Sequence, residues 1–221
     1  RMKLYNTLNR KKEEFHSINP GKASIYTCGP TVYRYIHIGN LRAFLTADLL
    51  RRTLTVSGFQ VEHIKNITDV GHMRQEALEQ GGDKMILAAL AEGKTSAEIA
   101  QYYTEAFHQD EEAMNILPAQ NFPKATDHVP DMINMVEELI ARKLAYVVEG
   151  NVYFDVEQYS NYGKLSGNAL ETLLDGVRID PDPLKRNQID FTLWKLAEDG
   201  REMKWMSPWG EGFPGWHIEC S

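Results

Sequence analysis

The sequence predicts an α/β fold with a parallel sheet, and two neighbouring patterns indicate it. Residues 23–28 resemble a short strand, and residues 41–57 carry leucines at near-helical spacing. Cys28 ends the first segment, and the loop that follows it contains Gly29, His37 and Gly39. It is therefore expected where a strand ends and a helix begins, which is the usual ligand-binding edge of an open parallel sheet.

The predicted helix over 41–57 begins with features that favour an anion. Asn40 is a plausible N-cap and Gly58 a plausible stop. Unpaired backbone N–H groups and the helix dipole in the first turn favour a phosphate. Gly39 leaves room for a nucleotide, and His37 can donate from either ring nitrogen. The alternative is an ordinary turn with an ordinary loop histidine.

Further elements follow along the chain. A strand over 59–67 would place Thr68 at its carboxyl end. The other predicted elements are a helix over 95–115 with an apolar face of Ile99, Tyr102 or Tyr103, and Phe107, a helix over 131–143, and a β-hairpin of 145–148 and 151–155 around Glu149 and Gly150. Gly81 and Gly82 are expected to interrupt a helical stretch, and 180–186 to form exposed charged turns.

Composition restricts the class of protein. The chain has 221 residues, 43% of them hydrophobic, and can therefore bury a core. Neither a membrane-spanning apolar run nor a leader is evident, so we expect a cytoplasmic protein without membrane contact. The net charge of −7 argues against a general nucleic-acid coat, because such proteins bind phosphates through clustered Lys and Arg. Local basic groups could still contact an RNA.

The two cysteines, Cys28 and Cys220, have three interpretations. A disulfide does not fit a reducing cytosol. Two unrelated buried thiols are the commonest situation, since free cysteine often only packs. A shared zinc site is the most specific hypothesis, but two thiolates supply only half of a tetrahedral shell.

Several short segments together carry a family resemblance. They are residues 2–8, 27–33, 37–40, 66–69, 190–195 and 215–221. In these segments the chain resembles the catalytic domain of cysteinyl-tRNA synthetases, which are class I aminoacyl-tRNA synthetases. The family signature His-Ile-Gly-His ends here in Asn40, a variant that the family commonly shows.

The resemblance implies a Rossmann-like parallel sheet that is interrupted by a connective α+β insertion. Residues 1–117 would form the first half of the nucleotide-binding domain, 118–205 the insertion, and 206–221 the start of the second half. The family's Lys-Met-Ser-Lys-Ser motif and anticodon-reading domain would lie beyond Ser221, so we expect this chain alone to be incomplete as an enzyme.

The resemblance also implies roles for individual residues. ATP, with Mg²⁺, would be bound by Gly29, Thr31, His37, Gly39 and Asn40, of which His37 and Asn40 would act in catalysis. Zn²⁺ would be held by Cys28 and Cys220, with its other two ligands outside this chain and His217 structural. The substrate cysteine would be held by Cys28, Thr68 and Trp216.

The implied reaction is activation of cysteine to cysteinyl-adenylate and its transfer to tRNA(Cys), by a monomer. A zinc ion would help the enzyme to select cysteine over serine, because an apolar pocket alone distinguishes these two amino acids poorly. Two alternatives stay open: a ligase that joins cysteine to an amino-sugar in thiol biosynthesis, and a non-catalytic synthetase-like binding module.

Overall fold

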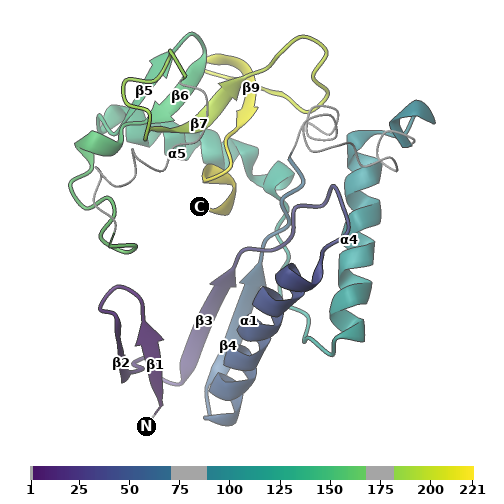
Figure 1. The fold of residues 1–221 in the computed structure, drawn as a ribbon, viewed down its shortest axis with the longest axis vertical. Coiled ribbons are helices and arrows are strands. Elements are labelled where there is room, and N and C mark those ends of the chain that lie inside the picture. Colours follow the sequence, from purple (N-terminus) through teal and green to yellow (C-terminus); the bar gives the residue numbers. More distant parts are fainter. Residues whose placement is uncertain (1, 71–88, 168–181) are drawn as a thin grey trace.

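The computed structural model describes residues 2–70, 89–167 and 182–221, which form two packed units (Figure 1). The strands are β1 Lys3–Asn6, β2 Lys11–Glu14, β3 Lys22–Thr27, β4 Gln60–Lys65, β5 Ala145–Val148, β6 Asn151–Phe154, β7 Phe191–Leu196, β8 Trp205–Ser207 and β9 Gly210–Pro214. The α-helices are α1 Ile38–Val56, α4 Ser96–Ala113 and α5 Val129–Ala141. Three short 3-10 helices cover Ala125–His128, Val156–Gln158 and Ile218–Cys220. None of the helices in these described ranges is long and apolar enough to cross a membrane.

The first unit contains the predicted parallel pair. β3 and β4 run parallel from Lys22 opposite Gln60 to Thr27 opposite Lys65, and α1 connects them. Residues 120–125 continue the sheet on the other edge of β4, where the Lys65 N–H donates to the Asn121 carbonyl at 3.0 Å. In Figure 1, α1 lies across β3 and β4, and α4 stands beside them. The α/β prediction is confirmed.

The inward face of α1 differs from the predicted leucine face. Phe44, Asp48 and Leu54 are buried, whereas Leu49 is exposed. Phe44 packs edge-on against Phe107 of α4, with ring centroids 5.4 Å apart. Buried Asp48 accepts hydrogen bonds from the Arg52 side chain and the Leu117 N–H, so a polar residue occupies a position on the inward face.

A buried ion pair joins the parallel pair to α4. Lys65, at the end of β4, is 0% exposed, and its ammonium group bonds to Glu111. The Lys65 ammonium also lies 4.9 Å from the centre of the Phe44 ring. Burial raises the pKa of Glu111 and outweighs the opposing influence of Lys65.

The second unit is an antiparallel sheet in the order β5-β6-β7-β9-β8, with α5 packed beside it (Figure 1). The predicted hairpin is confirmed: Ala145 pairs with Phe154, and Glu149 and Gly150 both have positive φ angles in the turn. Fully buried Trp194 of β7 lies in the core of this unit.

The predicted helices shift by a few residues. The helix predicted over 95–115 is α4, which Thr95 caps by accepting from the Glu98 N–H. The helix predicted over 131–143 is α5, two residues earlier. Gly81, Gly82 and part of 180–186 lie outside the described residues. The domain boundaries stay predictions.

Candidate functional site

The structure brings the two cysteine thiols together. Cys28 directly follows β3, and Cys220 closes the 3-10 helix Ile218–Cys220. Their sulfur atoms lie 3.4 Å apart although 192 positions separate them in the sequence. Both cysteines are free, so neither the disulfide nor the interpretation as unrelated thiols describes this arrangement.

The environment of Cys28 favours its neutral thiol form. Burial raises the pKa of Cys28 to about 11, assisted by the hydrogen bond to Cys220 and by the negative charges of Cys220 and Glu219. Burial likewise raises the pKa of Tyr26 to about 12, and the two cysteines add to this effect. A cation would supply the positive charge that thiolates require here.

The pair could supply two ligands of a metal shell. In the described part of the chain, no group of three or more His, Cys, Asp or Glu side chains is arranged to hold a metal ion. The His217 ring packs edge-on against Phe191 at 4.8 Å between centroids. This contact agrees with the structural role expected for His217.

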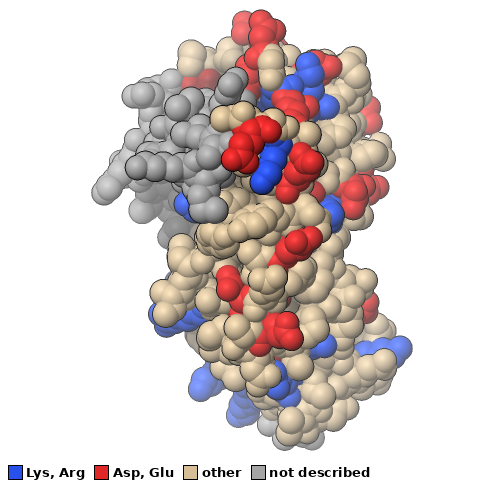
Figure 2. Space-filling view, turned by 90° about the vertical axis from the view of Figure 1, so that its right-hand side faces the viewer, with Lys and Arg blue, Asp and Glu red and all other residues tan. Residues whose placement is uncertain are grey.

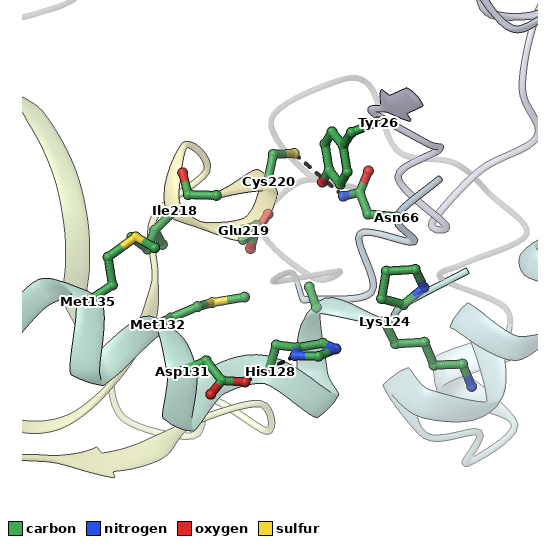
Figure 3. Close-up of a pocket in the computed structure, with 13 residues that line it drawn as sticks. Tyr26, Asn66, Lys124, His128, Asp131, Met132, Met135, Ile218, Glu219 and Cys220 are labelled. Carbon is green, nitrogen blue, oxygen red and sulfur yellow. Dashed lines mark hydrogen bonds and ion pairs between the residues drawn. The ribbon is translucent and has the colours of Figure 1, made fainter. Parts of the chain in front are cut away.

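Asn66 links the segments around the thiols, a role that the sequence did not reveal. Its side-chain oxygen accepts from the Gly29 N–H at 2.7 Å, and its amide nitrogen donates to Thr68 Oγ1 at 3.3 Å and Cys220 Sγ at 3.5 Å. Figure 3 shows the bond to Cys220. The available signal was the position of Asn66, a polar residue directly after β4 and before Thr68.

Gly29 is required by close backbone packing. A Cβ atom at this position would lie 1.7 Å from the Asn66 carbonyl oxygen, so no side chain fits. The glycine thus lets the loop after β3 approach the end of β4. This packing accounts for Gly29 independently of any nucleotide.

Thr31 and Thr68 pair through their backbones just beyond the two strands. The Val32 N–H donates to the Thr68 carbonyl at 3.2 Å, and the Thr68 N–H donates to the Pro30 carbonyl at 3.0 Å. Thr68 is buried and lies one hydrogen bond from Asn66, so the structure joins it to the thiol pair. Trp216, in contrast, is 71% exposed.

The N-cap of α1 is not the predicted residue. His37, not Asn40, is the N-cap: its Nδ1 accepts from the Gly39 N–H at 3.0 Å. Asn40 lies in the first turn, and its side-chain oxygen accepts from the His37 N–H at 3.1 Å. The Asn40 N–H donates to the His37 carbonyl, so the first turn has fewer open N–H groups than predicted.

The cap also fixes the tautomer of His37. Because Nδ1 accepts a backbone proton, the neutral ring carries its own proton on Nε2, and only Nε2 can donate outward. His37 is exposed and therefore offers this donor to solvent or a ligand. A Cβ at Gly39 would lie 2.8 Å from the His37 ring, so the glycine makes room for the capping imidazole.

Sequence comparisons place this arrangement in a known family. The family model described as "tRNA synthetases class I (C) catalytic domain" matches residues 14–221. The chain belongs to this class I tRNA synthetase catalytic-domain family. The predicted family resemblance and its fold class are thereby confirmed.

Individual relatives are similar over the whole chain. A "Cysteine--tRNA ligase" of Treponema denticola is 47% identical over 100% of this chain, and one of Carboxydothermus hydrogenoformans is also 47% identical over 100%. A "Cysteine--tRNA ligase" of Thermus thermophilus is 44% identical over 99%. In each case this chain covers 45% of the relative, so it spans less than half of their length.

A cavity of about 220 Å³ lies beside Cys220 in this catalytic domain (Figure 3). It is lined by residues of both units, among them Tyr26, Asn66, Met132, Met135, Ile218 and Cys220. His128 and Asp131, paired at 3.1 Å, also line it. Cys28, Thr68 and Trp216 do not line this cavity, so the three predicted substrate residues lie outside it.

Charges on the face shown in Figure 2 are mixed. Acidic side chains run down its middle, and basic ones lie mainly toward its upper and lower ends. The described part of this face of the catalytic domain therefore lacks a continuous basic stripe, in agreement with the net charge of −7.

Proposed function

We propose that this domain is the cysteine-activating part of a cysteine–tRNA ligase, which joins cysteine to ATP as an adenylate and transfers it to tRNA(Cys). The family membership and the relatives named "Cysteine--tRNA ligase" support this proposal. The observation that carries it is the 3.4 Å separation of Cys28 and Cys220 at the carboxyl end of β3. This is where an α/β sheet binds its ligand.

We propose zinc as the ion that the thiol pair holds. Two sulfurs on one tetrahedral zinc, at about 2.3 Å each, lie about 3.8 Å apart. The observed 3.4 Å is close to that value, so the pair fits half of a zinc shell. When bound, zinc would accept the substrate's sulfur as a thiolate and reject the hydroxyl of serine.

Adenylation requires no protein nucleophile in this proposal. The carboxylate of cysteine attacks the α-phosphorus of ATP, the new oxygen–phosphorus bond forms, and pyrophosphate leaves. The protein contributes by holding the two reactants in line and by stabilising the phosphate charge.

His37 would donate from Nε2 to the ATP phosphates, because its Nδ1 is held by Gly39. Gly29 and Thr31 lie in the loop between β3 and α1, and His37 is at the end of the same loop. Asn40 would act by keeping His37 in its capping position. We assign Mg²⁺ to the ATP itself.

Thr68 and Trp216 would contact the amino acid. Thr68 Oγ1 accepts from Asn66 and retains a second lone pair for the substrate's ammonium group. Trp216 presents an exposed indole four residues before Cys220, where it could cover the small side chain of a bound cysteine.

Cysteine-dependent exchange between ATP and pyrophosphate tests the proposal. The ligase that contains this domain is assayed with and without added zinc, with serine as the control amino acid. We expect exchange with cysteine and a loss of at least tenfold in Cys28→Ser and Cys220→Ser. Equal exchange with serine, or none with either amino acid, contradicts selective activation; transfer of cysteine to an amino-sugar but not to tRNA would assign the other ligase.

A further inference from the structure

Asn66 occupies the centre of the proposed cysteine site without being one of the residues assigned to the zinc or the substrate. It is 3% exposed, and each polar atom of its side chain has a partner. Those partners lie in three segments: the loop after β3, the segment after β4, and the 3-10 helix at Cys220. One side chain thus connects Gly29, Thr68 and Cys220.

The orientation of this carboxamide is fixed by chemistry. The Gly29 N–H can only donate, so the group facing it must be the Asn66 oxygen. The amide nitrogen therefore faces Thr68 Oγ1 and Cys220 Sγ, which can both accept. A rotated amide would set two donors against each other at Gly29, so only one orientation satisfies the site.

The backbone around Asn66 is held firmly as well. Its carbonyl oxygen packs directly against Gly29, where no Cβ fits. The preceding residue, Lys65, is fully buried and paired with Glu111. A side chain on such a support can fix the place of its partners, because it has little freedom to follow them.

We propose that Asn66 is a positioning residue for the cysteine site, and this inference rests on the proposed function. Its N–H group holds Cys220 Sγ next to Cys28, and the same amide nitrogen directs one lone pair of Thr68 Oγ1. The second lone pair of Thr68 then remains for the substrate ammonium. Asn66 acts through these groups and does not touch the reacting atoms.

Asn66→Asp is the sharpest variant, because a carboxylate keeps the acceptor for Gly29 and removes the donor to Cys220 and Thr68. It also places a negative charge beside the sulfur. Asn151→Asp is the matched control in the second unit. Asn151 is 9% exposed, accepts from the Leu196 N–H at 3.0 Å and donates to the Val148 carbonyl at 3.3 Å, so it is a buried amide with similar bonds away from the thiols.

The thiol pair itself gives a readout that needs neither zinc nor activity. Phenylarsine oxide binds tightly only where two thiols can bridge one arsenic atom. We expect one equivalent per wild-type chain, weaker binding by about tenfold or more in Asn66→Asp, and no change in Asn151→Asp. Circular dichroism of each variant establishes that it is folded; if Asn66→Asp does not fold, Asn66→Ser, which retains a short polar group, takes its place.

Zinc affinity and exchange kinetics complete the test. For Asn66→Asp we expect zinc affinity to fall by about 10- to 100-fold, the range typical of lost partners of metal ligands. In the exchange assay the KM for cysteine should rise by about tenfold or more, while the KM for ATP stays unchanged. The separate response of the two substrates distinguishes positioning from a general loss of structure.

The outcomes separate the two proposals. If the wild type lacks cysteine-dependent exchange but Asn66→Asp still weakens arsenical and zinc binding, the function is wrong and the positioning role stands. If exchange is present but folded Asn66→Asp leaves arsenical binding, zinc affinity and the KM for cysteine unchanged, the positioning role is overturned. It is equally overturned if Asn151→Asp has the same effects, or if the wild type does not bind the arsenical through both thiols.

Discussion

At the start of helix α1, three residues, His37, Gly39 and Asn40, position one another, whereas the thiol pair depends on segments from both ends of the chain. His37 and Asn40 exchange hydrogen bonds three residues apart, and Gly39 leaves space for the histidine ring. Cys28 and Cys220 meet across 192 positions, and Asn66 connects the segments around them. A local motif can survive damage to the core, but a site made of distant segments requires the whole packing beneath it.

The largest predicted effect comes from Gly29→Ala. The new Cβ would lie 1.7 Å from the Asn66 carbonyl oxygen, and backbone cannot move aside without separating the ends of β3 and β4. We expect a loss of about 4 kcal/mol or more in the free energy of unfolding, measured by urea denaturation. Gly21→Ala is the control, because its Cβ meets nothing within 4 Å and only its φ of +73° opposes alanine. A loss of about 1 kcal/mol is expected there; an equal loss in both variants would contradict the packing argument.

Lys65→Met tests the buried pair below the thiol site. The change leaves Glu111 buried without its cation, and we expect a loss of about 3 kcal/mol in unfolding free energy. The double variant Lys65→Met with Glu111→Leu should recover part of that loss, because both charges are then gone. Urea denaturation of the single and double variants measures the difference, and no recovery in the double variant would show that lost packing dominates.

The pH dependence of folding stability should depend on the protonation of His63 in β4. Burial lowers its pKa from 6.5 to about 4, with contributions from Lys65 and Arg51 that outweigh Asp48. Above pH 6.5 both states are neutral; below it the unfolded chain takes up a proton that the folded chain refuses until about pH 4. Folding stability should therefore fall, by about 3 kcal/mol, as the pH drops through this window.

The matching measurement is urea denaturation between pH 7 and 4 for the wild type, His63→Gln and His16→Gln. His63→Gln should flatten the decline, and His16→Gln, at an exposed position, should leave it unchanged. If the unfolding free energy declines equally with pH in all three proteins, His63 does not cause the decline.

A smaller change in stability is predicted for the local motif. In Gly39→Ala the new methyl group displaces the His37 ring and breaks its cap, which should lower stability by about 1 kcal/mol. Phenylarsine oxide binding to the thiol pair should stay unchanged. Loss of that binding would show that the N-terminus of α1 and the thiol pair depend on each other.

His37→Asn separates capping from phosphate binding. Asparagine can still cap the helix, so stability should change by only a few tenths of a kcal/mol. It lacks the Nε2 donor, so exchange of ATP and pyrophosphate should fall by tenfold or more. Unchanged exchange would remove His37 from the proposed ATP site.

The same contrast, between contacts within a local segment and contacts between distant segments, explains which features the sequence could predict. Periodicity located β3, β4 and α1 within a few residues, and the pair Glu149 and Gly150 located the hairpin, because these signals are local. Spacing alone could not unite Cys28 with Cys220; the family resemblance supplied that pairing. The choice of His37 over Asn40 as the cap depends on ring geometry, and the role of Asn66 depends on three segments that meet only in the fold.

Cobalt titration of the chain shows whether the distant cysteines form one metal-binding thiol pair. The sulfur-to-cobalt charge-transfer absorption is followed in the wild type, Cys28→Ser and Cys220→Ser. We expect one cobalt per wild-type chain with the absorption of two thiolates, and a loss of that absorption by half or more, with weaker binding, in each variant. Absorption and affinity that do not change in Cys220→Ser would show that the two sulfurs do not share a metal.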